Sequence, residues 1–429
     1  MSVRRTALSL LTAFEERGGF ANLLLSDAVL AHAGEDAPLL TALFYGTVER
    51  RLTLDYATGV LSARDSESLS AHTRNLLRLG LYQIYFMKTP AHAATDQTVS
   101  LGESKGEKAL VNAVLRRAAQ TPLPLPPEAR TARFLSVKHS FPLSTVRHFL
   151  SLYGKEETDA LLSAYNEVAP LTVTVNCGRT TRDAYLALLL DAGIPAEKTA
   201  YAARSVRLAL SLPPEKLPHF KDGFFLIQDE ASAIAMEALG AKAGDVIVDV
   251  CSAPGGKILS AATSVEGEGT FYAFDIHESK LSLIRESAER LGVSLHVGVL
   301  DATVGDPTLF GKADRVICDV PCSGLGVLGK KPDLRYREKS DSLAPLGLEI
   351  LNTSAKYVKT GGVLLYSTCT LAPDENEENV RRFLDTHEDF APIDFSFAGG
   401  LESRDGMLTL LPHQHGTDGF FVAKLMKQK

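Results

Sequence analysis

Cysteine is scarce in this sequence, and its arrangement excludes the usual structural uses of the thiol. The 429 residues include five cysteines, an odd number spread along the chain, and no CxxC pair occurs. A disulfide framework is therefore not expected, and a reducing cytoplasm is favoured. Cys318 and Cys322 lie four residues apart, but no His-rich segment completes a ligand set, so we expect no metal site.

Long apolar runs are also absent. No stretch of about eighteen or more uncharged apolar residues occurs, so we expect no membrane-spanning helix. The N-terminus starts like a signal peptide with Arg4 and Arg5, but Glu15 and Glu16 interrupt its apolar run and no small-residue cleavage site follows. An amphipathic first helix is predicted instead.

The sequence lacks the excess of basic residues that is typical of many nucleic-acid-binding proteins. Its net charge is −7, although residues 1–133 hold 15 Lys and Arg against 13 Asp and Glu. An acidic protein can still bind RNA through a local basic face, because phosphate contacts form only at the footprint. Charge alone therefore neither predicts nor excludes an RNA partner.

The N-terminal part of the chain is predicted to be helical. Apolar residues recur at helical spacing, with breaks between the segments, in Ala7–Phe14, Leu39–Tyr56 and Leu76–Met87, the breaks falling near Gly18-Gly19, Gly34 and Pro90. We interpret the basic residues of these helices as solvated faces: Arg50, Arg51, Arg74, Arg78, Arg116 and Arg117. The proline-rich stretch TPLPLPP, residues 121–127, cannot continue a helix and marks a domain boundary.

The rest of the chain divides into a mixed segment and a region of alternating strands and helices. The mixed segment is predicted to be a small α+β module with strands at Pro170–Val175 and Ser205–Leu210 and a helix at Asp183–Ala192. From Gln228 the alternation predicts a doubly wound, mostly parallel sheet, whose ligands bind at the carboxyl ends of the strands. Its expected strands are Asp245–Cys251, Thr270–Asp275, Ser294–Val299, Asp314–Asp319, Gly362–Thr368 and Gly419–Leu425, and its expected helices are Glu278–Leu291, Leu346–Val358 and Asp374–Thr386.

The first three of these strands lead into loops that suit a nucleoside cofactor. The first strand runs into DVCSAPGGK, residues 249–257, where a Gly-Gly pair lets the backbone approach a ligand closely. The second strand ends in Asp275, placed to bond a ribose diol, and Asp301 after the third could contact an adenine. Dinucleotide and P-loop sites fit less well, because G-x-G-x-x-G is absent and Ile258 follows the lysine where a P-loop needs Ser or Thr.

Two cysteines follow the fourth and fifth strands. The fourth strand ends in DVPCSG, residues 319–324, and the fifth in YSTCT, residues 366–370. Buried cysteines are commonly inert, and we interpret Cys177, Cys251 and Cys318 in that way. Cys322 and Cys369 differ because each lies in a polar turn just past a strand, beside the expected cofactor.

A cysteine in this position suits nucleophilic catalysis of methyl transfer to cytosine. Carbon 5 of cytosine does not readily accept a methyl group from a sulfonium, but addition of a thiolate at carbon 6 converts the ring into a reactive enamine. The thiolate needs an electropositive pocket, which Lys257 and the sulfonium can supply. Asp319 could hold the cytosine edge and help protonate N3. On these grounds alone, either Cys322 or Cys369 could be the nucleophile.

Taken together, the motifs resemble those of the NOL1/NOP2/Sun family of RNA cytosine-5 methyltransferases. The matching segments, within about residues 228–425, are DVCSAPGGK, DVPCSG, KPDLR, YSTCTL followed by PDENE, and DGFFVAKL. The helical N-terminal third resembles the NusB-like RNA-binding domain that precedes this catalytic domain in bacterial members acting on small-subunit ribosomal RNA. The resemblance implies a multidomain chain: an all-α NusB-like domain (1–125), an α+β connector (126–227) and an α/β Rossmann-like class I methyltransferase domain with a mostly parallel sheet (228–429).

The resemblance also implies the site residues. Cys369 of the TC motif would be the nucleophile, Cys322 of the PC motif would assist product release, and Lys257 and Asp319 would complete the catalytic set. S-adenosylmethionine would be the methyl donor, with no metal, and its contacts would be Cys251, Ser252, Ala253, Pro254, Gly255, Gly256, Lys257, Asp275, Asp301 and Asp319. The sequence departs from the family pattern at Ile258, at Gly347 and at 329–331, where GKK replaces an arginine pair; lysine cannot reproduce the bidentate fork with which arginine grips a phosphate.

The implied substrate is one cytosine of 16S ribosomal RNA, in a loop or flipped out of its helix, since the base must be unstacked to meet the thiol. A monomeric cytoplasmic enzyme is expected. Three alternatives stay open: cytosine-5 methylation of tRNA or another RNA, a non-catalytic RNA-binding ribosome assembly factor, and an amino-group methyltransferase. The last would need an aromatic residue at the position of Cys322.

Overall fold

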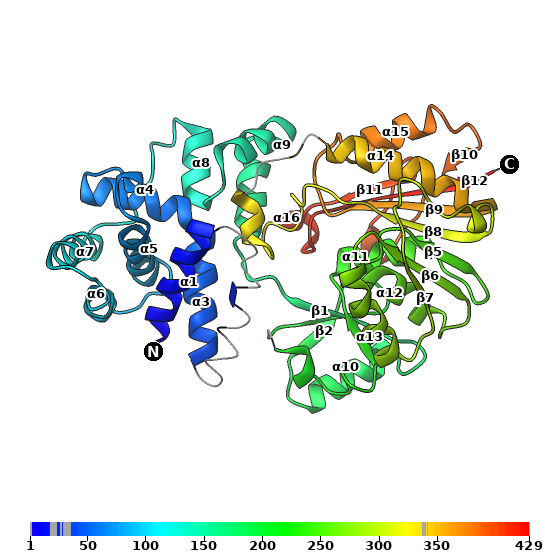
Figure 1. Cartoon of the computed structure of the whole chain (residues 1–429), viewed down its shortest axis with the longest axis horizontal. Helices are drawn as coiled ribbons and strands as arrows, with labels where there is room; N and C mark the ends of the chain where they lie inside the picture. Colours follow the sequence, from blue (N-terminus) through cyan, green and yellow to red (C-terminus); the bar gives the residue numbers. More distant parts are fainter. Residues whose placement is uncertain are drawn as a thin grey trace. The chain divides into compact units, whose positions relative to one another are not determined.

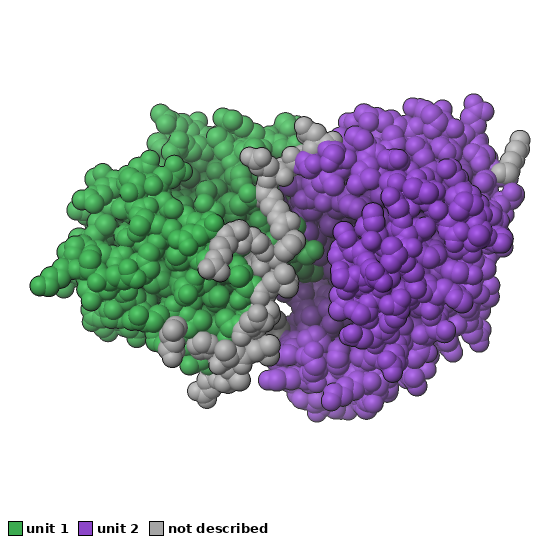
Figure 2. All heavy atoms as spheres, viewed as in Figure 1, with its two compact units in different colours: residues 1–167, 330–337 green, residues 168–329, 338–429 purple. Residues whose placement is uncertain are grey.

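The computed structural model describes residues 2–17, 24–25, 28, 36–210, 212–336, 340 and 342–428. The chain forms two compact units, which Figure 2 colours separately. Unit 1 consists of residues 1–167 together with 330–337, and unit 2 of residues 168–329 and 338–429. The two units are defined by contacts within the structure, whereas the boundaries at 125 and 227 were predicted from the sequence. Those two boundaries stay predictions.

Unit 1 is helical, as predicted. Its helices among the described residues are α1 (Val3–Arg17), α3 (Asp36–Glu49), α4 (Arg51–Ser62), α5 (Ala71–Tyr85), α6 (Ala91–Val99), α7 (Lys105–Ala118), α8 (Thr131–His139) and α9 (Leu143–Ala164), with short 3-10 turns at Ser66–Ser68 and Pro332–Tyr336. The first helix is amphipathic, burying Ala7, Leu8 and Leu11 in the unit's core. The apolar segment 39–56 is divided between α3 and α4 at Arg50. The break predicted at Pro90 separates α5 from α6, whereas Gly18-Gly19 and Gly34 lie outside the described residues.

The arginines of α5 are not the solvated face that the sequence predicted. Arg78 is 3% exposed and donates to both carboxylate oxygens of Asp55, at 2.6 and 2.7 Å, and to Glu15 at 3.0 Å. Arg74 bonds the other oxygen of Glu15 at 2.8 Å. These ion pairs join α1, α4 and α5, so the prediction is wrong for Arg74 and Arg78. Glu15, one of the two acidic residues that interrupt the apolar run of the N-terminus, therefore has a structural role in unit 1.

The first part of unit 2 is a small α+β module that corresponds to the later part of the predicted connector, 126–227, whose residues 126–167 lie in unit 1. In the described residues its antiparallel sheet has the order β2-β3-β1-β4. The helix α10 connects β1 to β2 in the chain. The elements are β1 (Leu171–Val175), α10 (Arg182–Asp191), β2 (Ala196–Lys198), β3 (Ser205–Leu208) and β4 (Phe225–Ile227), with a 3-10 turn at Pro214–Lys216. Both predicted strands and the predicted helix are confirmed.

The remainder of unit 2 is built on an eight-stranded sheet, counted over the described residues. Its strands are β5 (Val246–Asp249), β6 (Thr270–Asp275), β7 (His296–Val299), β8 (Ala313–Asp319), β9 (Val358–Thr368), β10 (Phe390–Pro392), β11 (Met407–Leu410) and β12 (Phe420–Lys427). The helices are α11 (Glu230–Leu239), α12 (Gly256–Ser264), α13 (Leu281–Leu291), α14 (Leu343–Ser354), α15 (Glu377–Leu384) and the short α16 (Pro412–His415), with 3-10 turns at Glu278–Lys280, Pro307–Leu309, Ala355–Tyr357 and Ala398–Gly400. Figure 1 shows α11, α12 and α13 on one face of the sheet and α14 and α15 on the other, in keeping with two separate apolar cores.

The order of the strands explains why the predicted loops meet. The path β10-β12-β9-β8-β5-β6-β7 is parallel from β9 to β7, while β12 runs antiparallel to β9, β10 and β11. Its direction of growth reverses between β5 and β8, which is where open α/β sheets bind ligands. The six predicted strands are confirmed, and the fold is Rossmann-like. The edge strands β10 and β11 and the helices α11 and α12 were not predicted.

Candidate active site

The loop after β5 is shaped for close approach of a ligand. Gly255 has a φ of +101°, a conformation that favours glycine, and a Cβ there would lie 3.2–3.3 Å from Leu259 and Ile284. A Cβ on Gly256, the first residue of α12, would meet nothing within 4 Å. The backbone N–H of Ser252 donates to the carbonyl of Phe274 at 2.7 Å. The loop is thus fixed to β6, with open space over its second glycine.

The carboxylate of Asp275 lies directly against this loop. One oxygen accepts the backbone N–H of Ala253 at 3.2 Å, and the other accepts that of His277 at 2.9 Å. A carboxylate has about four acceptor positions, so both oxygens keep capacity for the hydroxyls of a ribose. The predicted neighbourhood of 251–257 and Asp275 is therefore present, and its donors and acceptors fit an adenosine-containing cofactor.

Asp301 follows β7 at the same edge of the sheet but is not joined to that loop by a hydrogen bond that the structure records. Its carboxylate is exposed and accepts the backbone N–H and the hydroxyl of Thr303, at 2.9 and 2.6 Å. The hydrogen bonds to Thr303 lower the pKa of Asp301. The connection to Asp275 is through the backbone, where Leu300 N–H donates to the Asp275 carbonyl at 3.1 Å.

Lys257 and Asp319 form an ion pair at the switch point of the sheet. The Lys257 ammonium lies 2.7 Å from one oxygen of Asp319, and the Ser367 hydroxyl donates to the other oxygen at 2.7 Å. Burial lowers the pKa of Lys257, but the attraction of Asp319 and further anionic groups outweighs it, and the net shift is upward. The lysine nitrogen also lies 5.4 Å from the centre of the Phe420 ring. A permanent positive charge is therefore held at this point.

A second carboxyl, that of Asp249, interacts electrostatically with both members of the pair. Asp249, at the end of β5, is 1% exposed, and its oxygen Oδ1 accepts the backbone N–H of Cys251 at 3.3 Å. Burial, followed by the charge of Asp319, raises the pKa of Asp249 to about 7. Asp249 was not among the predicted site residues, although it is the first residue of the motif DVCSAPGGK, whose residues 251–257 were predicted to bind the cofactor.

The two cysteines predicted to be reactive lie side by side. The Sγ atoms of Cys322 and Cys369 are 3.4 Å apart, and both cysteines are half-buried and outside any disulfide. The hydrogen bond to Cys369, followed by burial, raises the pKa of the Cys322 thiol well above its usual value. Cys369 is among the groups whose negative charge raises the pKa of Lys257. The thiols and the ammonium therefore belong to one site.

Two glycines bring the backbone of Cys369 into its place. The N–H of Gly326 donates to the Cys369 carbonyl, and the N–H of Gly419 donates to the Gly326 carbonyl, both at 2.9 Å. A Cβ on Gly326 would lie 1.8 Å from the Gly419 oxygen and 2.8 Å from the Cys369 oxygen. The loops after β8 and β9 and the turn before β12 can meet only because neither glycine has a side chain.

The other three cysteines show no such environment. Burial raises the pKa of Cys251 above its usual value and that of Cys318 to about 12, which disfavours their thiolates. Cys177 lies in the connector, after β1. Within the described ranges no group of three or more His, Cys, Asp or Glu side chains is placed to hold a metal ion, and no helix has the length and apolar character to span a membrane.

Ser367 and Phe420 are site residues that the sequence reasoning missed. Ser367 lies opposite Asp319 in the pairing of β8 with β9, so its hydroxyl reaches the carboxylate. In the sequence, the feature that could have indicated Ser367 is its position two residues before Cys369 of the TC motif. Phe420 begins β12, and no feature of DGFF indicates that its ring faces Lys257.

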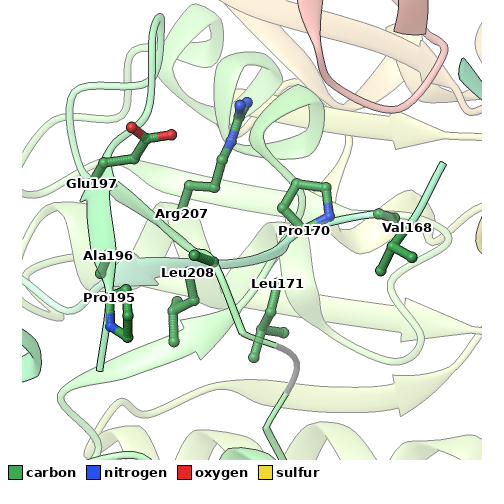
Figure 3. A pocket seen from close by; sticks show the side chains of 10 residues that line it. Val168, Pro170, Leu171, Pro195, Ala196, Glu197, Arg207 and Leu208 are labelled. Atoms are coloured by element: carbon green, nitrogen blue, oxygen red, sulfur yellow. The ribbon is translucent and has the colours of Figure 1, made fainter. Parts of the chain in front are cut away.

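A separate hollow of about 410 Å³ lies in the connector (Figure 3). Its lining is largely apolar and comes from residues 168–171, 195–197 and 207–209. The Arg207 guanidinium donates to Glu230 at 3.2 Å and to the Gly416 carbonyl at 3.0 Å. None of the site residues lines it, so it is not part of the site described above.

A Rossmann-like sheet with a Gly-Gly loop after its first strand, a carboxylate at the end of its second strand and an ion pair at its switch point is typical of the nucleoside-binding α/β domains, a class that includes methyltransferases. Residues 236–426 match the family described as 16S rRNA methyltransferase RsmB/F, residues 1–120 match the NusB family, and residues 141–213 match an RsmF/B-like ferredoxin-like domain. The chain belongs to the RsmB/F methyltransferase family.

Relatives of known family match most or all of the chain. A probable ribosomal RNA small subunit methyltransferase B from Bacillus subtilis is 34% identical, covering 100% of this chain and 99% of the relative. Ribosomal RNA small subunit methyltransferase B from Pseudomonas putida is 33% identical over 91% of each. The solved structure of a methyltransferase homologue from Pyrococcus horikoshii is 26% identical, with a TM-score of 0.60, and covers 69% of this chain and 99% of that one.

Proposed function

We propose that the protein transfers a methyl group from S-adenosylmethionine to carbon 5 of a cytosine in 16S ribosomal RNA, through a covalent bond between Cys369 and carbon 6. Family membership and the names of its relatives support methylation of small-subunit ribosomal RNA. The observation that carries the cytosine chemistry is the 3.4 Å separation of the Cys322 and Cys369 sulfurs beside the half-buried ammonium of Lys257. Methyl transfer to an amino group uses an aromatic residue and needs neither thiol.

The residues around the first three strand ends suit the methyl donor. When bound, S-adenosylmethionine supplies an electrophilic methyl group. The loop 251–257 would lie along it, Asp275 would accept from its ribose, Asp301 would contact its adenine, and Asp319 would lie beside its methionine part. The open space beside Gly256 and the remaining acceptor capacity of the Asp275 carboxylate support this assignment.

The chain's own groups would perform the covalent steps. The Cys369 thiolate adds to carbon 6, and the Lys257 charge favours that thiolate. Asp319, held by Ser367, orients the cytosine edge during addition. After transfer a base accepts the carbon 5 proton, the electron pair of that C–H bond re-forms the carbon 5–carbon 6 double bond, and the bond between carbon 6 and Cys369 breaks to release the thiolate. We assign assistance of this release to Cys322, because its sulfur lies beside the bond that breaks.

The assignment of roles to the two thiols rests on their motifs. Cys369 belongs to the TC motif, which carries the nucleophile in the family that the sequence resembles, and its charge is coupled to the Lys257 ammonium. A nearby cation favours ionisation of a thiol, which suits Cys369 for the addition. We further propose that the enzyme acts as a cytoplasmic monomer on an unstacked cytosine.

Two cysteine variants test the proposal. Cys369→Ala should abolish methyl transfer and retain S-adenosylmethionine binding. Cys322→Ala should accumulate a protein–RNA adduct that survives denaturation, because addition proceeds and release does not. Full turnover by Cys369→Ala would refute the proposed nucleophile. An adduct that accumulates in Cys369→Ala but not in Cys322→Ala would mean that the roles are reversed.

A further inference from the structure

The motif PDENE, residues 373–377, takes no part in the chemistry described so far, yet two of its side chains contact the loops of both reactive cysteines. Glu375 and Asn376 are 2% and 1% exposed, just before α15. A buried carboxylate and a buried carboxamide must find hydrogen-bond partners to offset their loss of water. Their partners are the residues next to Cys322 and Cys369.

Asn376 holds the Cys369 loop on both sides of the cysteine. Its side-chain oxygen accepts the hydroxyl of Thr368 at 2.6 Å, and its side-chain nitrogen donates to the carbonyl of Thr370 at 3.0 Å. Thr368 and Thr370 are the two chain neighbours of Cys369. One carboxamide therefore fixes the path of the backbone that carries the nucleophile.

Glu375 holds the Cys322 loop. Its carboxylate oxygen Oε2 accepts the backbone N–H of Ser323 at 2.8 Å. The Ser323 hydroxyl in turn lies 2.6 Å from that of Thr370, which links the two cysteine loops directly. The carbonyl of Glu375 accepts the Tyr366 hydroxyl at 2.6 Å, so the motif is also fastened to β9.

We propose that Glu375 and Asn376 are positioning residues that set the separation of the two reactive sulfurs, Asn376 through the Cys369 loop and Glu375 through the Cys322 loop. The inference rests on the proposed function, in which the two sulfurs act at successive steps on one pyrimidine. Because the two residues are consecutive, a single short turn fixes both loops relative to each other. A displacement of about 1 Å at a reacting group can cost about 100-fold in rate.

The two contacts predict different defects. Loss of the Asn376 side chain frees the nucleophile loop, so addition to carbon 6 slows and no adduct builds up. Loss of the Glu375 side chain frees the loop of Cys322, so the adduct forms and then persists. A residue that only stabilised the fold would weaken both steps and cofactor binding together.

The experiment compares Asn376→Ala and Glu375→Ala with Glu377→Ala, whose carboxylate contacts Thr409 instead of a cysteine loop. Adduct formation and release are followed in single turnover with a ribosomal RNA fragment, and S-adenosylmethionine affinity is measured for each variant. Asn376→Ala should slow adduct formation at least about tenfold, and Glu375→Ala should slow release by a similar factor. Both should keep cofactor affinity within about twofold, and Glu377→Ala should match the wild type.

Conservative variants keep the test decisive if an alanine variant does not fold. Glu375→Gln retains an oxygen that can accept from Ser323, so it should restore much of the release rate. Asn376→Asp retains the acceptor for Thr368 but loses the donor to Thr370, so it should stay as slow as the alanine variant. Wild-type rates in both alanine variants, interchanged defects, or equal loss of both steps with loss of cofactor binding would each overturn the proposal. Failure of the proposed function would appear separately, as an adduct still formed by Cys369→Ala.

Discussion

The guanidinium carbon of Arg335 lies 4.2 Å from the centre of the Phe141 ring, although Arg335 belongs to a sequence motif of the catalytic domain. Arg335 is 1% exposed and donates to the carbonyl of Tyr165 and the side chain of Asn166, both at 2.9 Å. The next residue, Tyr336, donates to the carbonyl of Val48 at 3.0 Å. Arg335 of the KPDLR motif is therefore buried within unit 1, where its guanidinium is hydrogen-bonded to other residues of that unit.

We predict that Arg335→Ala destabilises unit 1 by about 2–4 kcal/mol, because the buried carbonyls lose a charged donor and the Phe141 ring loses its partner. Arg335→Lys should be nearly as damaging, since an ammonium cannot span the same acceptors as a planar guanidinium. Hydrogen exchange at the ends of α3 and α9, with chemical denaturation, measures the effect. The exposed Arg116→Ala on α7 is the control, expected within about 0.5 kcal/mol of wild type. Wild-type stability in Arg335→Lys would contradict the account.

The raised pKa of Asp249 predicts that the stability of the protein depends on pH. Its pKa is about 7 in the folded protein against an ordinary 3.8, so between these values the folded state keeps a proton that the unfolded state has lost. Its contribution to stability is therefore full below about pH 4 and falls as pH rises to about 7, by about 4 kcal/mol in total. Asp249→Asn should remove this fall. The free energy of unfolding of the variant should therefore increase relative to that of the wild type as pH increases. Denaturation series from pH 4 to 8 test this.

The control for that series is Asp385→Asn, which removes an exposed carboxylate at the end of α15 and should run parallel to the wild type. A difference between Asp249→Asn and wild type that stays constant with pH would show that the Asp249 carboxyl is not protonated in the folded state near neutrality.

Gly326→Ala should disable the active site without removing any reactive group. The added Cβ would overlap the Gly419 carbonyl at 1.8 Å, so the loop that receives the Cys369 carbonyl must move. We expect methyl transfer to fall about 100-fold or more, with S-adenosylmethionine affinity retained. Gly59→Ala in α4, where a Cβ meets only ordinary contacts, should leave transfer unchanged and stabilise the helix by up to about 1 kcal/mol. A Gly326→Ala enzyme with wild-type kcat would mean that this contact does not position Cys369.

Much of the fold and the site followed from the sequence, for a definite reason. Short apolar strands alternating with helices specify a parallel sheet, and a parallel sheet places all its loops of one kind at one edge. The neighbourhoods of four residues were predictable because each lies at the end of a strand, in the loop after it or in the first turn of the next helix: Lys257, Asp319, Cys322 and Cys369.

Contacts between segments far apart in the chain were not predictable. The ion pairs of Arg74 and Arg78 need acidic partners on other helices, and an exposed arginine has the same sequence pattern. The burial of Arg335 in unit 1 could not be inferred, because its motif is surrounded in sequence by catalytic segments. The separation of the two sulfurs likewise depends on how residues 370–376 fold back, which periodicity does not encode.

The central claim is that Cys369 forms the covalent bond to the pyrimidine, and a substrate carrying 5-fluorocytosine tests it most directly. Fluorine at carbon 5 cannot leave as a proton does, so the enzyme should stop as an adduct after methyl transfer. Peptide mapping of the trapped complex by mass spectrometry should place the RNA nucleotide on Cys369. A nucleotide found on Cys322, or methylation of the unmodified RNA with no trapped complex, would contradict the account.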